Sequence, residues 1–258
     1  KAILIPDLPY FRAHHNKVFM EVLRDVIGNK EIQKFSSQSF GTYEEYKQFF
    51  VQKGLPVVLK PSAGSKSRNV SVAHNKKEVD RYARRLSATP SFFNLMLWCR
   101  NLFDGRGFSR ISNNRRKFTI QPFIPNLLGD YKIVVYGEKY FVLFRENRPG
   151  DFRASGSGRL SFPKNVPQEV LSYARQVFET FKVPFISIDV GYDGQLCYLF
   201  EFQFVLFGQY VIEKSPRYFH WNENRWNCVE NRSVVEDELV LSTHSYIQKR
   251  NKEVSDGS

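Results

Sequence analysis

Residues 185–207, FISIDVGYDGQLCYLFEFQFVLF, constrain the fold of this chain more than any other stretch. Two runs of apolar, β-branched and aromatic residues flank a central Asp-Gly pair, and this pattern predicts a β-hairpin. Asp189 lies in the first run, whereas Glu201 and Gln203 lie two residues apart in the second. Pleating therefore puts Glu201 and Gln203 on one face, and closing the hairpin can bring Asp189 to the same face.

These three polar residues interrupt otherwise apolar strands. A charged carboxylate in such a place is costly unless something compensates it, and converging oxygen ligands suit Mg²⁺ held together with substrate phosphates. The sequence therefore suggests a metal site made of Asp189, Glu201 and Gln203. Three residues form a short motif, so a half-exposed hairpin with two solvated acids is the alternative.

Length and composition set the class of protein. The chain has 258 residues, of which 42% are hydrophobic, and can bury the core of one large or two small domains. No apolar run approaches the ~20 residues of a membrane span, and the first residues lack the pattern of a signal peptide, so we expect a cytoplasmic protein. The three cysteines are far apart and not in any zinc spacing, so neither disulfides nor a structural metal are expected.

The formal net charge of +12 favours polyanionic partners, although it does not say which, and a solvated basic surface is the alternative. Much of this charge lies in a Gly/Ser/Asn-rich segment within residues 91–117. Clustered arginine in a loop is typical of a polyanion-binding flap, but also of a merely soluble loop. The basic residues of the segment are Arg100, Arg106, Arg110, Arg115, Arg116 and Lys117.

The first forty residues predict a short strand over Ala2–Ile5 and a helix over residues 16–26. Asn16 is a suitable N-cap for this helix. Lys17 would then lie in the first turn, where a cation is unfavourable against the helix dipole unless an anion is nearby. Further helices are predicted over residues 42–52, 76–86, 92–102 and 168–181.

A second informative stretch begins with the apolar run 57–59, which places Lys60 at the end of a strand. Pro61 and a loop of small residues at 62–67 follow. Small residues let backbone N–H groups approach a phosphate closely, and Lys60 supplies a point charge there. The order of a Walker A loop is absent, and a hairpin loop with surface lysines is the alternative.

Residues 118–124 predict a strand whose prolines place its end at an edge or outside the sheet. Such a segment can present backbone donors and acceptors to a planar ring. Further along, Arg145, Arg148 and Arg153 converge on a Gly/Ser loop, where guanidinium groups could clamp a phosphate or carboxylate.

In this order, the motifs resemble the ATP-grasp superfamily, and in particular its ribosomal-protein-modifying glutamate ligase branch, from Asn16 to Phe207. The resemblance implies an α+β chain with the ATP-grasp fold. Two α/β subdomains with antiparallel sheets would clasp ATP between them, and the N-terminal pre-grasp domain would be reduced or absent. Residues 1–41, an N-terminal strand and helix, would be a remnant of this domain or a link to it. Residues 42–124 would be the small subdomain with a basic insertion at 91–117, and residues 125–258 the large subdomain with the metal site and a C-terminal helix.

The resemblance also implies a role for each site residue. Lys17 and Lys60 would contact ATP phosphates, and Asp130 would lie near the ribose or the edge of the active site. Arg145 and Arg153 would be catalytic, facing the γ-phosphate and the acyl phosphate, with Ser155 beside them. Asp189, Glu201 and Gln203 would hold two Mg²⁺ ions, with Mn²⁺ as an alternative. The hinge that holds adenine would consist of Gln121, Pro122, Phe123 and Ile124.

Some positions depart from the pattern of this superfamily. Gln203 stands where asparagine is usual, and it keeps the carbonyl ligand on a longer arm. Pro122 replaces a common acidic residue, which is tolerable if the backbone reads adenine. Residues 204–221 form an aromatic run in place of a polar loop, so acceptor recognition is the least transferable part of the resemblance.

The activity that the resemblance implies is an ATP- and Mg²⁺-dependent carboxylate–amine ligase. ATP would phosphorylate a carboxylate of a peptide or an acidic surface glycan, and an amino acid or amino compound would attack the acyl phosphate. The alternatives are an ATP-grasp phosphotransferase and a basic nucleic-acid-binding module. We expect acidic substrates and no membrane span; nucleic acid is not the expected partner, and a homo-oligomer is compatible with this interpretation.

Overall fold

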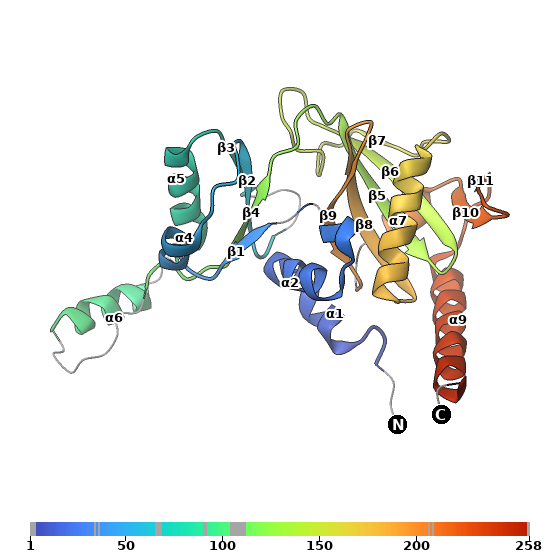
Figure 1. The fold of residues 1–258 in the computed structure, drawn as a ribbon, viewed down its shortest axis with the longest axis horizontal. Coiled ribbons are helices and arrows are strands. Elements are labelled where there is room, and N and C mark those ends of the chain that lie inside the picture. Colours follow the sequence, from blue (N-terminus) through green and yellow to red (C-terminus); the bar gives the residue numbers. More distant parts are fainter. Residues whose placement is uncertain are drawn as a thin grey trace. The chain divides into compact units, whose positions relative to one another are not determined.

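The computed structural model describes residues 4–33, 35, 37–64, 69–89, 92–103, 112–205, 207 and 209–256. The described residues form two compact units, shown in Figure 1. Unit 1 comprises Lys1–His14, Val22–Lys34 and Ile124–Ser258, and unit 2 comprises His15–Glu21 and Phe35–Phe123. Half of the predicted small-residue loop, residues 65–67, lies outside the described residues, as do Arg106 and Arg110 of the basic segment.

Unit 2 is built on a four-stranded antiparallel sheet in the order β1-β4-β2-β3. Helices α4 and α5 pack on one face of this sheet (Figure 1), and their apolar side chains meet buried residues such as Leu59, Phe118 and Ile120. The elements of this unit are β1 Gln38–Phe40, α4 Tyr43–Phe49, β2 Val57–Pro61, β3 Ser71–Ala73, α5 Lys76–Ser87, α6 Phe92–Phe103 and β4 Phe118–Pro122.

Unit 1 is built on a larger antiparallel sheet in the order β11-β10-β6-β5-β8-β9, with β7 paired to β6. Helix α7 packs against β5, β8 and β9, while α8 contacts β6 and α9 contacts β5 and β8. The elements are β5 Gly129–Tyr136, β6 Lys139–Glu146, β7 Leu160–Ser161, α7 Gln168–Phe181, β8 Phe185–Tyr192, β9 Cys197–Gln203, α8 Tyr210–Lys214, β10 Tyr218–Asn222, β11 Arg225–Val229 and α9 Val235–Asp256.

The two faces of the unit 1 sheet differ in chemistry because alternate residues of a strand point to opposite sides. Ile133, Ile186 and Ile188 are fully buried, and each such side chain contributes roughly 1.5–3 kcal/mol. On the alternate positions, Val134 and Leu143 pack with residues of α8 and α9. The same alternate positions carry polar side chains toward the ends of the strands, and these form the candidate site described below.

The N-terminal segment corrects one prediction. Leu4 and Ile5 are not part of a strand, and residues 2 and 3 lie outside the described part of the chain. A helix that the sequence analysis did not predict follows instead, with Asp7 at its N-cap and a proline in its first turn. The N-terminal helices are α1 Leu8–Ala13, α2 Lys17–Ile27 and α3 Lys30–Gln33.

Several predicted helices begin where their capping residues indicate. The Asn16 Oδ1 atom accepts a hydrogen bond from the backbone N–H of Phe19 at 3.1 Å, as the predicted N-cap of α2 requires. The Thr42 hydroxyl accepts one from the N–H of Glu45 at 3.0 Å, and the Glu45 carboxylate reaches back to the N–H of Gly41. This arrangement is close to the predicted capping box.

The hairpin expected at residues 185–207 is formed by β8 and β9. Its turn is fixed by Asp193, whose Oδ1 atom accepts hydrogen bonds from the N–H groups of Gln195 and Leu196 at 2.8 and 2.7 Å. Gly194 adopts a φ of +96°, which suits glycine. The Asp-Gly pair therefore has the turn-forming role that the sequence predicted.

The predicted subdomain boundaries differ from the observed units in the N-terminal part. Residues 1–41, expected as a separate remnant, are divided between the two units, and the chain passes from unit 2 to unit 1 at Phe123 and Ile124. The predicted hinge residues lie at this crossing. Among the described helices, none combines the length and the apolar character that crossing a membrane requires.

Candidate active site

Asp189 and Glu201 are directly opposite each other on the antiparallel strands β8 and β9. Ser187 and Gln203 are opposite each other one pair further along. Because cross-strand partners share a face, all four side chains project to the same side of the unit 1 sheet. The Gln203 Nε2 atom donates a hydrogen bond to the Glu201 Oε1 atom at 2.9 Å. The structure thus brings together the three residues predicted as metal ligands.

A buried ionic cluster adjoins this acid pair. The guanidinium of Arg145 binds both oxygens of Asp130, with Nε–Oδ1 at 2.5 Å and Nη2–Oδ2 at 2.9 Å. The Arg145 Nη2 atom also lies 2.7 Å from the Asp189 Oδ2 atom. The ammonium of Lys132 lies 3.5 Å from the other oxygen of Asp189 and donates to the Ser187 hydroxyl at 2.8 Å.

The register of three strands explains why these charges meet. Asp130 on β5 is paired with Arg145 on β6, and Lys132 on β5 is paired with Asp189 on β8. Asp130 and Lys132 are two residues apart and therefore face the same side. Asp130 and Asp189, two predicted site residues more than fifty positions apart in the sequence, thus both bind Arg145.

The cluster shifts the pKa of both its aspartates, in opposite directions. Burial alone would raise the pKa of Asp189, but the charges of Arg145 and Lys132 outweigh burial and lower this pKa to about 2. Burial raises the pKa of Asp130 above its ordinary value, against the attraction of Arg145. Asp189 is therefore a carboxylate throughout the physiological range and available as an oxygen ligand.

Arg153 and Ser155 lie in the loop after β6, as part of unit 1. Arg153 forms an ion pair with Asp151, with Nη2–Oδ2 at 2.5 Å, and its own N–H also donates to this carboxylate. Arg148 donates to the backbone oxygens of Ser155 and Gly156, both at 3.2 Å. The arginines of this loop thus stabilise its conformation, and Arg153 is one-third exposed.

Unit 2 holds the two predicted lysines. Lys60 belongs to β2 and is paired with Thr119 of β4, on the sheet face opposite to the one covered by α4 and α5. The Lys17 ammonium donates to the backbone oxygen of Gly64 at 3.1 Å, and the Lys17 N–H donates to the oxygen of Ser62 at 2.8 Å. The first turn of α2 is therefore joined to the small-residue loop that follows β2.

The predicted hinge begins with Gln121, which is only 2% exposed. Its Nε2 atom donates to the Glu21 Oε1 atom at 3.0 Å, while its Oε1 atom has no hydrogen-bond partner among the described residues. Pro122 is exposed, and Phe123 and Ile124 are partly buried. The Phe123 N–H donates to the oxygen of Pro56 at 3.2 Å. A buried acceptor at the start of the hinge fits a ligand that brings hydrogen-bond donors, as adenine does.

The oxygen donors in unit 1 fit a divalent metal ion, although the described residues contain no cluster of three or more His, Cys, Asp or Glu side chains. Two carboxylates and one amide carbonyl form a small set of hard ligands. Mg²⁺ in phosphate-transfer sites is bound by one or two carboxylates together with substrate phosphates, so this number suffices. The Gln203 Nε2 atom donates to Glu201, which leaves the carbonyl oxygen as the potential ligand.

Sequence analysis did not assign a role to two residues of these sets. Lys132 binds Asp189. Its sequence position, two residues after Asp130 in the same strand, could have indicated that it belongs to the site. Glu21 is 7% exposed and binds Gln121. Glu21 lies next to Met20, which is also buried, and no pattern in the sequence indicated a partner for it.

Comparison with solved structures identifies the fold. N5-carboxyaminoimidazole ribonucleotide synthetase, solved as its ADP complex, matches with a TM-score of 0.53 and 12% identity, over 79% of this chain and 48% of that one. D-cycloserine synthetase matches with a TM-score of 0.53 and 13% identity, over 77% and 64%. L-amino acid ligase from Bacillus licheniformis matches with a TM-score of 0.51 and 15% identity, over 81% and 48%.

This chain has the ATP-grasp fold. The fold class predicted from the sequence, with antiparallel sheets in mixed α/β units, is therefore confirmed. The chain spans about half to two thirds of the length of these three proteins. No model of a known protein family matches the sequence, and no curated protein does.

Proposed function

We propose that this chain is an ATP- and Mg²⁺-dependent ligase that joins an amine to a carboxylate through an acyl phosphate. The ATP-grasp fold supports the proposal, since the three similar proteins are named as synthetases or ligases and one of them was solved with ADP. The observation that carries it is the pairing of Asp189 with Glu201, beside Arg145 and Lys132. Two carboxylates for a metal and two cations for phosphate lie on one face of one sheet.

Each residue of unit 1 has a distinct role in the proposal. Asp189, Glu201 and the carbonyl of Gln203 would hold two Mg²⁺ ions or, alternatively, Mn²⁺. Bound Mg²⁺ neutralises charge on the phosphates of ATP. Arg145 and Lys132 now balance Asp189, and their N–H donors can equally bind the oxygens of the transferring phosphoryl group. Asp130 keeps Arg145 in position through two hydrogen bonds.

Unit 2 would bind the remainder of the nucleotide. Lys17 and Lys60 would contact its phosphates, and the backbone of residues 121–124 would hold adenine, with the buried Oε1 of Gln121 accepting from a nearby donor. Arg153 and Ser155 of unit 1 would contact the acyl phosphate from their loop. The subdomain boundaries 42–124 and 125–258 remain part of the same proposal.

The proposed reaction has two steps. The γ-phosphoryl group passes from ATP to a carboxylate oxygen and ADP leaves; an amine nitrogen then attacks the carbonyl carbon, loses a proton and expels phosphate. Preorganised charges that stabilise the phosphoryl group supply the catalysis, and no protein side chain forms a covalent bond. The acceptor carboxylate would belong to a peptide or an acidic glycan.

Release of ADP from Mg-ATP tests this function with the full chain. Pools of carboxylates and amines are screened separately and together. The proposal expects release above background only when a carboxylate, an amine and Mg²⁺ are all present. Release with a stable phosphorylated product and no need for amine would instead indicate a phosphotransferase, and the lack of any Mg²⁺-dependent ATP binding would contradict both.

A further inference from the structure

The charge of this chain is unequally divided between its two units. Unit 2, His15–Glu21 with Phe35–Phe123, contains 17 lysines and arginines and 6 aspartates and glutamates, a net charge of +11. The whole chain carries +12, so the larger unit 1 is nearly neutral at +1. Such asymmetry between parts of a chain is typical of a polyanion-binding surface.

The acidic residues described in unit 2 are bound mainly by neutral donors. Glu44 accepts hydrogen bonds from the Ser112 hydroxyl, and Glu78 accepts one from the N–H of His74 at 2.8 Å. Asp80 accepts a hydrogen bond from the Tyr46 hydroxyl at 2.6 Å and has Lys47 at 3.7 Å. These acids therefore fix the fold of unit 2 more than they neutralise its arginines.

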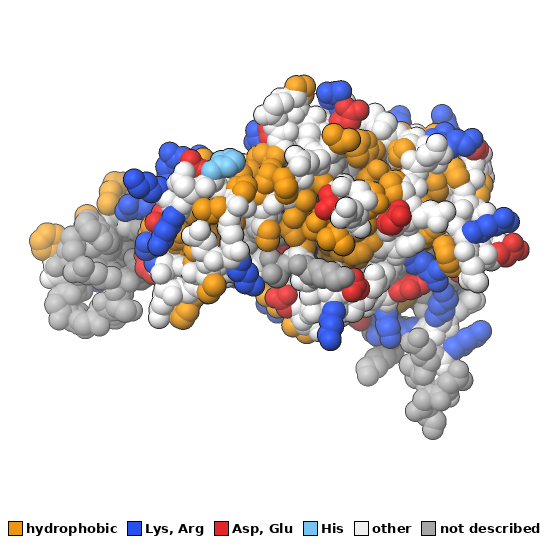
Figure 2. Space-filling view, turned by 45° about the horizontal axis from the view of Figure 1, so that its top comes forward, with side chains coloured by type: hydrophobic (Ala, Val, Ile, Leu, Met, Phe, Trp, Pro, Cys, Tyr) orange, Lys and Arg blue, Asp and Glu red, His pale blue; other side chains and the backbone are white. Residues whose placement is uncertain are grey.

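Three arginines of unit 2 lie close together in the C-terminal part of α5. Arg81, Arg84 and Arg85 are all exposed, at positions i, i+3 and i+4 of one helix. The guanidinium carbons of Arg81 and Arg85 lie 4.9 and 5.7 Å from the ring centre of Tyr82, so this aromatic ring orders two of the three side chains. Figure 2 shows blue side chains gathered to the left of the view, where α5 lies.

The loop that precedes β4 brings further basic residues close to the end of α5. The Arg116 N–H donates to the backbone oxygen of Ser87 at 2.9 Å, and the Thr89 N–H donates to that of Asn113 at 2.8 Å. These bonds join the loop to the end of α5. Two basic stretches that are about thirty residues apart in the sequence, 81–85 and 115–117, thereby lie near each other in unit 2.

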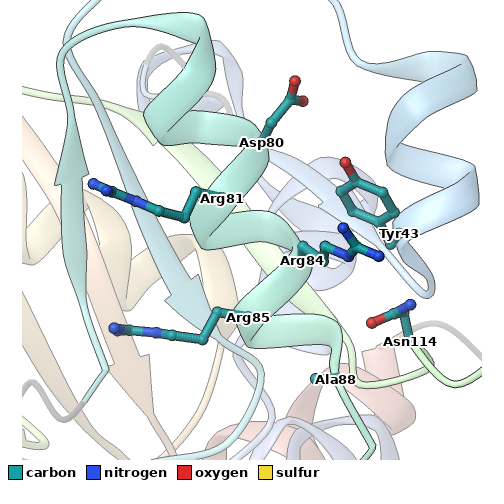
Figure 3. A pocket seen from close by; sticks show the side chains of 7 residues that line it. All are labelled: Tyr43, Asp80, Arg81, Arg84, Arg85, Ala88 and Asn114. Carbon is teal, nitrogen blue, oxygen red and sulfur yellow. The ribbon is translucent and has the colours of Figure 1, made fainter.

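A pocket of about 550 Å³ opens on this face. Figure 3 shows Arg84 lying toward Tyr43 and Asn114, while Arg81 and Arg85 extend to the other side of the helix. The lining combines guanidinium groups, an aromatic ring, an amide and the carboxylate of Asp80. This mixture offers charge for phosphates, a ring for stacking, and both donors and acceptors for base edges.

From these observations we infer that the α5 face of unit 2 binds single-stranded nucleic acid. Arg84 contacts a phosphate at the pocket, Arg81 and Arg85 contact phosphates further along the strand where it crosses the helix, and Tyr43 stacks with a base that enters the pocket beside Asn114. A peptide of aspartates and glutamates alone offers carboxylates for the arginines but no planar ring for Tyr43. A duplex keeps its bases stacked, so they do not enter such a pocket. Basic residues also lie outside the pocket, which favours a nucleic-acid strand of several nucleotides over a free nucleotide. This function is independent of the ligase activity proposed above.

Fluorescence anisotropy with a labelled single-stranded oligonucleotide tests the inference on the full chain. Affinity should fall steeply with salt, since each phosphate contact contributes a slope of about −0.7 in log K against log salt. The triple variant Arg81→Gln, Arg84→Gln, Arg85→Gln should lose about tenfold or more in affinity, and its slope should become shallower by about 2. Tyr43→Leu keeps an apolar side chain and should weaken binding without changing the slope.

A matched control removes the same charge from unit 1. Arg159, Lys164 and Arg225 are well exposed there, and their simultaneous change to Gln should leave oligonucleotide affinity within about twofold at fixed salt. Circular dichroism and a cooperative thermal unfolding transition, measured on every variant, report whether the chain is folded. Equal affinity for a duplex, a free nucleotide or polyglutamate would overturn the inference, as would unchanged binding by a folded α5 triple variant.

Discussion

The carboxylate of Asp189 faces Glu201 across the β8–β9 pair and binds Arg145 on its other side, so it belongs both to an acid pair and to a buried ion pair. Glu201 has a different environment, in which the amide of Gln203 binds one of its oxygens. Of these two cross-strand partners, Asp189 is held in a buried ion pair, whereas Glu201 is bound by a neutral amide. In the proposed function both are metal ligands.

The first prediction concerns stability. Asp189→Asn removes one of the two carboxylates that balance Arg145, whose side chain is 10% exposed. We expect the free energy of unfolding to fall by about 2–3 kcal/mol, because Asp130 still compensates part of the buried charge. Urea denaturation measures this change. Glu201→Gln is the matched control and should cost less than about 1 kcal/mol; equal losses in the two variants would contradict this description of the cluster.

The second prediction follows from the pKa of Asp189, which is lowered to about 2. An unfolded aspartate titrates near 4, so the folded state binds this proton less tightly. The stabilisation by Asp189 is thus complete above about pH 4 and is lost as the pH falls toward 2. The difference in unfolding free energy between wild type and Asp189→Asn should shrink over this range. A difference that stays constant down to pH 2 would show that Asp189 is not paired.

The third prediction concerns Gln203, which stands where the sequence resemblance led us to expect asparagine. If the amide carbonyl is a metal ligand, Gln203→Asn should keep Mg²⁺-dependent ATP turnover within about tenfold of the wild-type rate. Gln203→Leu has no such carbonyl and should lower the rate by more than about tenfold. Turnover is measured as ADP release with and without Mg²⁺. Equal activity of the leucine and asparagine variants would remove Gln203 from the proposed metal site.

The fourth prediction concerns the thiols. Cys99 is exposed, whereas burial raises the pKa of Cys197 to about 12 and also raises that of Cys228. Since the thiolate is the reactive form, a disulfide reagent at pH 8 should modify Cys99 rapidly and Cys197 only after unfolding. Counting modified thiols over time checks this. A fast phase that persists in Cys99→Ser would contradict the described burial.

Local patterns were sufficient to predict the parts of the fold that depend on them. The β8–β9 hairpin follows from its alternating residues and its Asp-Gly turn, and α2 begins at the residue whose side chain caps it. The hairpin of β10 and β11 was missed because its turn is formed by Glu223 and Asn224, with φ of +51° and +59°, where glycine would have been the usual signal. Helix α1 has only six residues and starts among prolines that also suit a loop.

The candidate site was predictable in its residue types but not in its contacts. Asp189, Glu201 and Gln203 could be placed together because one hairpin carries all three. The bonds from Arg145 to Asp130 and Asp189 depend on the register of β5 with both β6 and β8, which no local pattern specifies. The sequence resemblance led us to expect that Arg145 faces a phosphate. Its pairing with two carboxylates became apparent only in the structure.

Mg²⁺-dependent binding of a non-hydrolysable ATP analogue, measured by calorimetry, tests the central claim most directly. Wild type and the exposed-acid control Glu223→Gln should bind the analogue about tenfold or more tightly with Mg²⁺ than with a chelator. Glu201→Gln should remain folded and lose this difference. If Glu201→Gln shows the same Mg²⁺-dependent gain in affinity as wild type, the acid pair of β8 and β9 is not the metal site and the proposed chemistry is wrong.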